Sequence, residues 1–253
     1  MSLSLTMLVA LVGFGCAQPQ PGGIYYASGE DSVTPEGLRR VRWKPFRATW
    51  VMPGADFKRY DKLLVQEVTV SYEAPPRTTR FRGKPVDPNY ALSNAAIESM
   101  KRHFREAFAE SLGRSEYFSV TNAPGPDVLL LSGHIVDLKI TTPPVAQQDP
   151  DEHVYTRSWG RMSLVLDALD SKSGEPLVRV GQSRFIEMGG PGWYKSNPVS
   201  ASGAVRWIFR SWADDLRREL DDFRSLREPI RTANDGSSIT ASCCGRIQRQ
   251  PPE

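Results

Sequence analysis

The sequence has few of the residue types on which enzyme active sites most often depend. Only three histidines and three cysteines occur among its 253 residues, which leaves little material for acid–base chemistry, metal clusters or a disulfide framework. The Gly-x-Ser-x-Gly motif of serine hydrolases and the glycine-rich phosphate-binding loop are both absent. We therefore expect no enzymatic activity and no cofactor.

An excess of charge and a long apolar run are also missing. The 32 basic and 29 acidic residues nearly balance, whereas nucleic-acid-binding proteins usually carry a strong basic excess on one face, so we expect no nucleic acid partner. The most apolar stretch, Leu3–Phe14, is too short for a transmembrane helix, which needs about 20 residues. Its length is typical of a secretory signal, and we assign residues 1–15 to a signal peptide.

A lipid anchor is the first hypothesis for the segment after this signal. Gly13-Phe14-Gly15-Cys16 resembles the cleavage box of bacterial lipoproteins, in which the cysteine becomes the acylated N-terminus. Residues 16–34 would then form a flexible tether, and the acyl chains would hold the protein stably at a membrane. Ala17 differs from the aspartate that retains many lipoproteins at the inner membrane, which favours the periplasmic face of the outer membrane.

Two alternatives remain for the N-terminus. Ordinary cleavage after Ala17 would release a soluble periplasmic protein without Cys16. An apolar N-terminus buried in a cytoplasmic protein is the third possibility. Gly13 stands where lipoproteins usually have leucine, and the first basic residue is Arg39.

The remaining periodicity predicts one α/β domain over residues 35–230, followed by a flexible tail over 231–253. Apolar residues three and four positions apart predict a helix from Asn94 to Leu112, capped by Ser93 and ended by a left-handed Gly113. A second amphipathic helix is expected over Ala201–Phe223, with the charged residues from Asp214 to Asp222, Glu219 included, on its solvent face.

Strands are predicted around these helices. One strand, Leu63–Tyr72, should present Leu64, Val68, Val70 and Tyr72 on one face, while residues 24–61 and 73–90 are expected to be loops. The other expected strands are Tyr117–Val120, the long Val128–Ile140, and a hairpin of Gly160–Leu169 with Leu177–Glu187. The predicted fold is a mixed, mostly antiparallel sheet packed by two amphipathic helices, opening with a strand–helix–strand unit.

Six short blocks of sequence resemble a known family. They are Pro35–Leu38, Trp50–Asp56, Tyr60–Val65, Pro124–Leu129, Asp170–Glu175 and Trp212–Leu216. Together they resemble an uncharacterised family of predicted bacterial lipoproteins, the domain of unknown function numbered three-three-one-three. The resemblance implies a secreted or lipid-anchored protein and no particular activity.

Binding is expected at Trp193 and Tyr194, which lie in a glycine-rich loop where exposed aromatic side chains often contact partners. His134, which follows Ser132 in a strand, is interpreted as a hydrogen-bonded strand residue. The acidic loop of Asp149, Asp151, Glu152 and His153 lacks the ligand spacing of a calcium site, so no metal is expected. Cys243 and Cys244 lie in the tail. Two interpretations are open for them: disulfide bonds between two chains, or no functional role.

The leading hypothesis is a non-enzymatic envelope lipoprotein, an accessory component that contacts the membrane through its lipid and another envelope component through its domain. The alternative is a soluble periplasmic binding protein for an apolar small molecule, held between sheet and helices. A hydrolase with a dispersed serine, histidine and aspartate is the third possibility.

Overall fold

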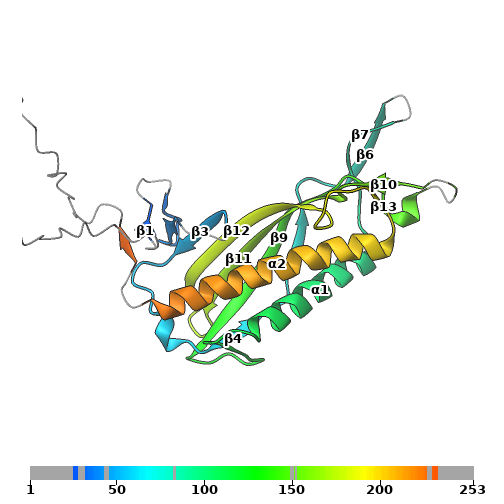
Figure 1. Cartoon of the computed structure of the whole chain (residues 1–253). Coiled ribbons are helices and arrows are strands. Elements are labelled where there is room, and N and C mark those ends of the chain that lie inside the picture. The colour runs from blue at the N-terminus through cyan, green and yellow to red at the C-terminus, as the bar shows by residue number, and fades with distance from the viewer. Residues whose placement is uncertain are drawn as a thin grey trace, which may run out of the picture.

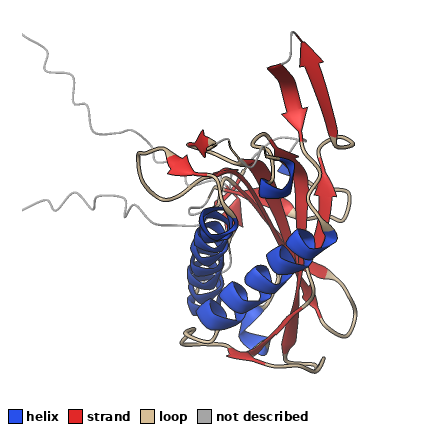
Figure 2. Cartoon of the chain, turned by 90° about the vertical axis from the view of Figure 1, so that its right-hand side faces the viewer, coloured by secondary structure: helices blue, strands red, loops and turns tan. Residues whose placement is uncertain are grey.

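The computed structural model describes residues 25–27, 32–42, 46–81, 84–148, 151, 153–226 and 230–232. Its fold is α/β, with a mixed, mostly antiparallel sheet and two amphipathic helices, as the sequence predicts. Both helices lie side by side on one face of the sheet (Figures 1 and 2), where they bury their apolar stripes.

The strands are β1 (Tyr25–Tyr26), β2 (Arg39–Val41), β3 (Ala48–Val51), β4 (Lys62–Val65), β5 (Thr69–Tyr72), β6 (Arg77–Phe81), β7 (Lys84–Asn89), β8 (Ser119–Val120), β9 (Val128–Ile140), β10 (Tyr155–Thr156), β11 (Gly160–Asp170), β12 (Pro176–Ile186), β13 (Tyr194–Lys195) and β14 (Arg231–Thr232). The helices are α1 (Asn94–Leu112) and α2 (Pro198–Ser225). Two short 3-10 turns cover Phe57–Arg59 and Val145–Gln147.

The main sheet has the strand order β14-β1-β2-β3-β12-β11-β9-β4-β8, and β5 pairs with β9 beyond the end of β4. Contacts from β1 through β12 and β11 to β9 are antiparallel, whereas β4 pairs in parallel with both β8 and β9. The unit β4–α1–β8 is therefore the parallel strand–helix–strand unit expected from the sequence. The first two residues of the expected tail pair with β1 as β14.

The long strand β9 is central, as predicted, since β11 flanks it on one side and β4 and β5 on the other. Its side chains alternate between the helix-covered face and the open face until Asp137, which has a φ of 53°. The pairing with β11 shifts at this point. Asp137 therefore occupies a β-bulge, and the extra residue allows both Ile135 and Leu138 to reach the core.

The bulge makes position 137 sensitive to β-branching. Asp137 is exposed and left-handed, a backbone conformation that a β-branched residue adopts only with strain. We expect Asp137→Val to lower the free energy of unfolding by about 1–2 kcal/mol, although valine favours ordinary strands. Urea denaturation measures the change. Asp137→Gly is the control and should be no less stable than the wild type; equal stability of the valine variant would contradict the strained bulge.

Helix α1 begins and ends at the residues that the sequence predicts. The Ser93 side chain accepts a hydrogen bond from the backbone N–H of Ala96, which confirms the N-cap. The prediction of a left-handed stop is wrong, because Gly113 has a right-handed helical φ of −64°. The chain leaves the helix there with the backbone N–H of Gly113 still bonded to the carbonyl of Ala109.

Helix α2 begins three residues earlier than expected, at Pro198. Asn197 caps it by accepting hydrogen bonds from the N–H groups of Val199 and Ser200, and the Ser200 side chain completes a capping box. Proline is favourable in the first turn, because it has no N–H to leave unpaired there. The cap and the proline thus extend the helix beyond its apolar stripe.

Several strand predictions need correction. The expected strand Leu63–Tyr72 is two strands, because Val65 and Thr69 are four positions apart whereas their partners on β9, Leu131 and His134, are only three positions apart. The extra residue reverses the facing, so that Leu63 rather than Leu64 is fully buried. Residues 24–61 and 73–90, expected as loops, contain β1–β3 and the hairpin β6–β7, which projects from the sheet (Figure 1).

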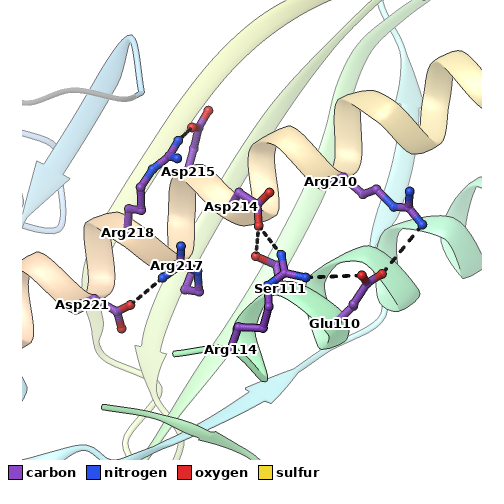
Figure 3. Close-up of polar contacts among 9 residues, drawn as sticks. All are labelled: Glu110, Ser111, Arg114, Arg210, Asp214, Asp215, Arg217, Arg218 and Asp221. Carbon is purple, nitrogen blue, oxygen red and sulfur yellow. Dashed lines mark hydrogen bonds and ion pairs between the residues drawn. The ribbon is translucent and has the colours of Figure 1, made fainter. Parts of the chain in front are cut away.

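The charged residues of α2 are not a simple solvent face. Asp214 accepts hydrogen bonds from Ser111 of α1 and from Arg114 in the turn after α1, and Arg210 pairs with Glu110, so these contacts join the two helices (Figure 3). Glu219 is fully buried, at 0% exposure. The prediction that Glu219 lies on the solvent face is therefore wrong, because the helix packs against the sheet on the side that carries this residue.

Candidate ligand groove

The residues expected to bind a partner lie on a two-stranded ribbon near the start of α2. Strand β13 pairs with β10, so that Tyr194 lies opposite Thr156 and Lys195 opposite Tyr155. Trp193 is 68% exposed, whereas Tyr194 is half-buried and packs against the core. Alternation along the ribbon places Trp193 on the face of exposed Tyr155. The structure therefore separates the two candidate residues.

A groove of about 430 Å³ opens close to this ribbon. Both helices begin at this end of the sheet (Figure 1). Five separate segments of the chain line it. These are residues 92–103 at the start of α1, residues 140–146 from the end of β9, Trp159 just before β11, Ile186 at the end of β12, and residues 196–205 at the start of α2. The volume falls within the range of about 300–1,000 Å³ typical of small-molecule sites.

The floor of the groove is buried and apolar. It includes Met100, Ile140, Trp159, Ile186 and Val205, each of which belongs to the buried core. Smaller residues, among them alanines and prolines, form the walls. The described residues that line the groove include no Asp, Glu, Lys or Arg. Such a surface favours apolar ligand groups over charged ones deep in the groove.

The polar groups around the groove are few and mostly satisfied. The Trp159 indole N–H donates to the Ser196 hydroxyl at 3.2 Å, and Gln148 donates to the same oxygen at 3.1 Å. The Thr142 hydroxyl donates to Thr156 at 3.1 Å. These bonds fix the side chains in place, which makes the site largely preformed.

His103 is the exception among these groups. It lines the groove and is only 9% exposed. Its Nε2 lies 3.3 Å from the Ser99 hydroxyl, while Nδ1 makes no hydrogen bond and lies 3.6 Å from a Glu106 oxygen. Burial lowers the pKa of His103, and Arg206 and Arg102 lower it further, against the raising effect of Glu106. The imidazole is therefore mainly neutral at pH 7.

Sequence reasoning missed the groove because its walls come from distant segments. The one local signal was His103 itself, a polar residue beside Met100 and Phe104 on the apolar stripe of α1. A histidine at such a position is usually a satisfied core residue, and only the unpaired Nδ1 distinguishes this one.

The other chemical candidates do not assemble into a reactive site. The Thr69 hydroxyl lies 2.8 Å from Nδ1 of His134, and the Ser132 hydroxyl lies 3.4 Å from Nε2. His134 is thus a hydrogen-bonded strand residue, as predicted. Its orienting partner is a hydroxyl rather than a carboxylate, unlike the arrangement in serine hydrolases.

No group of three or more His, Cys, Asp or Glu side chains suited to a metal occurs within the described ranges. Two members of the acidic loop, Asp149 and Glu152, lie outside those ranges, as do Cys16, Cys243 and Cys244. Among the helices that the structure describes, none combines the length and apolarity that crossing a membrane requires.

Three of the blocks that resemble a known family, Tyr60–Val65, Pro124–Leu129 and Asp170–Glu175, lie together at the opposite end of the sheet. The Tyr60 hydroxyl donates to Asp170 at 2.8 Å, and Lys62 forms an ion pair with Asp127. The Ser171 hydroxyl donates to the carbonyl of Gly125 at 2.8 Å. These bonds join β4 to the turns before β9 and after β11, so these three blocks build the fold rather than the groove.

Comparison with known proteins gives low similarity to several solved structures. The PelC dodecamer from Paraburkholderia phytofirmans is 14% identical, with 67% of this chain and 96% of that chain covered and a TM-score of 0.36. A DUF330 protein from Xanthomonas campestris is 10% identical, with coverages of 68% and 91% and a TM-score of 0.36. A minor lipoprotein from Acinetobacter baumannii is 12% identical, with coverages of 65% and 95% and a TM-score of 0.27.

These low TM-scores assign no function to this chain. No curated protein matches the sequence. The family model for proteins of unknown function, DUF3313, matches residues 36–216, which span the strands and helices from β2 into α2. The chain therefore belongs to the DUF3313 family of proteins of unknown function.

Proposed function

We propose that this protein is a non-enzymatic accessory protein of the bacterial envelope that holds an apolar ligand in the groove at the start of its two helices. The observation that carries the proposal is the groove itself, with its buried apolar floor and its lining free of charged side chains in the described chain. The Ser132 and His134 pair supports no competing catalytic proposal, because no carboxylate orients the imidazole.

The ligand is tested by analysing what the protein retains. The chain purified from membranes should release an apolar molecule on solvent extraction, detected by mass spectrometry. Ala96→Trp fills the groove, since Ala96 lines it and is half-buried, and should abolish the retained molecule. Ala109→Trp, at an exposed position of the same helix away from the groove, is the matched control. Equal retention by both variants would refute the groove as the site.

The anchor is part of the same proposal. An acylated Cys16 would keep the groove close to the membrane, where apolar ligands are abundant, and a short tether would allow it to move there. The intact mass of the membrane-purified protein, beside a Cys16→Ala control, tests this part. Acyl chains on an N-terminal Cys16 are expected; an unmodified chain beginning at Gln18 would mean a soluble periplasmic carrier instead.

A second candidate function is contact with another envelope protein, which the exposure of Trp193 and Tyr155 on one face of the β10–β13 ribbon favours. Exposed aromatic side chains are frequent anchors of protein interfaces. A photoreactive amino acid at position 193 should then give one defined crosslinked adduct in cells. The same probe at Tyr117, which is also exposed but lies far from the ribbon after α1, is the control. Identical adduct patterns would argue against a specific interface.

A further inference from the structure

The second half of strand β12 has a free edge. Strand β3 pairs with β12 only over Val178–Gly181, and no other described strand pairs with β12 on that side. Residues 182–186 therefore pair with β11 alone. Just beyond them, the Gly190 N–H bonds to the carbonyl of Met188, which marks a tight turn. The open stretch thus runs from residue 182 to residue 188, between the end of β3 and the glycine-rich loop.

The backbone groups that point out of this edge have no partner in the described chain. The carbonyl of Leu177 accepts from Met52, beside β3, whereas the carbonyl of Ile186 accepts from Trp159, beside β11. Successive residues of a strand direct their N–H and C=O groups to opposite sides, so those of Ser183 and Phe185 point toward the free edge. Neither residue makes a backbone hydrogen bond there to a described residue. Such a row of unpaired groups is a template for another strand.

The edge also has none of the features that usually prevent pairing with another chain. Natural edges are protected by lysine, proline, a bulge or a covering segment. Residues 182–186 include no lysine or proline, and their pairing with β11 is regular. Arg184 is directed to the helix face, where it bonds to Ser211 and Asp215 of α2. Phe185, on the opposite face, is 63% exposed. An apolar side chain rather than a charge therefore marks the centre of the edge.

We propose that this edge pairs with the same edge of a second copy of the chain, antiparallel to it and related by a two-fold axis beside Phe185. A two-fold axis brings the same row of donors and acceptors opposite itself, so an antiparallel edge is self-complementary. Residue 185 is also the midpoint of the open stretch from 182 to 188. The proposal does not depend on a ligand in the groove.

Two features favour this register. It places Phe185 opposite the partner's Phe185, and aromatic cross-strand pairs stabilise a sheet. A register centred on Arg184 would instead place two arginines opposite each other, which is destabilising. Pairing about Phe185 extends from residue 182 to residue 188 and stops before the second copy reaches β3 at Gly181.

Helix α2 offers a second contact beside the edge. On the flank of α2 next to β12, Ser211 bonds to Arg184, and Trp207 lies so close to Gly189 that an added Cβ would be 2.8 Å from the indole. Trp207 is nonetheless 47% exposed. Both helices lie on one face of the sheet (Figure 2), so the two-fold axis brings the same flank of a second α2 alongside. This contact adds apolar area toward the roughly 1,200 Å² or more that stable interfaces bury.

Analytical ultracentrifugation of the full chain tests the proposal. Cys16→Ala, Cys243→Ser and Cys244→Ser remove the acylation site and the cysteines of the tail, so that neither detergent nor disulfides contribute to association. We expect a species of twice the mass of one chain, in reversible equilibrium with the monomer. Ser183→Pro should weaken association roughly tenfold or more, because it removes an N–H that points away from β11 and leaves the β11–β12 pairing intact.

Charge exchange at position 185 tests the register. Phe185→Lys or Phe185→Glu alone places like charges opposite each other across the axis, so each variant should be mainly monomeric. An equal mixture of the two variants should associate again, because only the mixed pair brings lysine opposite glutamate. Val120→Lys is the control, since Val120 is exposed in the edge strand β8 on the other side of β9. This variant should dimerise as the wild type does, and thermal melting of each variant checks that it is folded.

The outcomes decide between a second copy and other occupants of the edge. A wild type that stays monomeric up to its highest soluble concentration would overturn the proposal, as would a dimer that no change at positions 183 and 185 weakens. Failure of the folded lysine and glutamate variants to associate with each other would overturn the register. A photoreactive amino acid at position 185 should give, in cells, an adduct of twice the mass of the chain. An adduct of another mass would overturn the second copy in favour of a strand from a different protein.

Discussion

Replacing Glu219 by glutamine should stabilise the protein at pH 8 and remove most of its loss of stability between pH 5 and pH 8. Glu219 is fully buried in α2, and neither carboxylate oxygen has a hydrogen-bond partner within the described chain. Burial raises its pKa to about 8, and Asp215 and Asp222 add to the shift. The nearby Thr49 hydroxyl of β3 lowers the pKa, but by less than burial raises it.

The direction of the effect follows from proton binding. Between the ordinary glutamate pKa of 4.5 and the folded-state value of about 8, the folded protein keeps a proton that the unfolded chain releases. This contribution is therefore fully present below pH 4.5 and is lost as the pH rises through 8, at roughly 1 kcal/mol per pH unit. Arg184 and Arg218 do not offset the charge, because both pair with Asp215 instead.

Thermal unfolding of both proteins at several pH values measures this effect. The melting temperatures of wild type and Glu219→Gln should be similar at pH 5. At pH 8 the variant should melt at the higher temperature, because its free energy of unfolding should exceed that of the wild type by about several kcal/mol. Glu116→Gln, which changes an exposed glutamate, corrects for the general effect of removing one carboxylate. A constant difference between wild type and Glu219→Gln at every pH would show that Glu219 does not titrate in this range.

Gly133→Val should destabilise the fold by about 2–3 kcal/mol, although valine is a better strand residue than glycine. A Cβ atom at position 133 would lie only 2.7 Å from the ring of Phe104. That ring is not free to move, because it stacks on Phe108 at 4.1 Å and meets Phe209 edge-on at 5.6 Å. Gly133 therefore sets how closely α1 approaches β9.

A glycine two strands away in the same sheet provides the control. At Gly181 in β12, the nearest atom to an added Cβ is a backbone oxygen at 3.8 Å, which is an ordinary contact. Gly181→Val should therefore be neutral or slightly stabilising, since it reduces the conformational freedom of the unfolded chain. Chemical denaturation of both variants gives the comparison. Equal stability of the two variants would mean that α1 shifts away from the sheet without significant cost.

Double substitution separates the clash from other effects. Phe104→Leu alone should destabilise the protein by leaving a cavity beside Phe108. In combination with Gly133→Val, the smaller leucine makes room for the new side chain. The double variant should therefore lose less stability than the sum of the losses in the two single variants. Strict additivity would argue against direct contact between these positions.

Much of the fold is determined by short-range patterns in the sequence. Helix α1 begins after Ser93 and ends at Leu112 as predicted, because its cap and its apolar stripe are encoded within one short stretch of the chain. The strand β9 and the β11–β12 hairpin are likewise recognisable from apolar runs and a glycine-containing turn. In each case the interactions that specify the element are local.

Features that depend on distant partners were beyond sequence patterns. Strand β3 exists because it pairs with β12, more than a hundred residues later in the chain, and the division of β4 from β5 depends on the register against β9. The left-handed stop predicted at Gly113 failed because the glycine continues in helical geometry. Short strands such as β3, and the turn at Gly113, contain too few residues to show a periodic apolar pattern in the sequence.

The sequence by itself determined the fold class, both helices and the central strands, since periodic burial and capping are local properties. Only the tertiary structure decided which residues meet. It buried the ionisable Glu219 against β3, separated Trp193 from Tyr194, and assembled a groove around His103 from five segments of the chain. The physical reason is that burial, pKa and cavity shape depend on packing between elements, which no single segment of the chain contains.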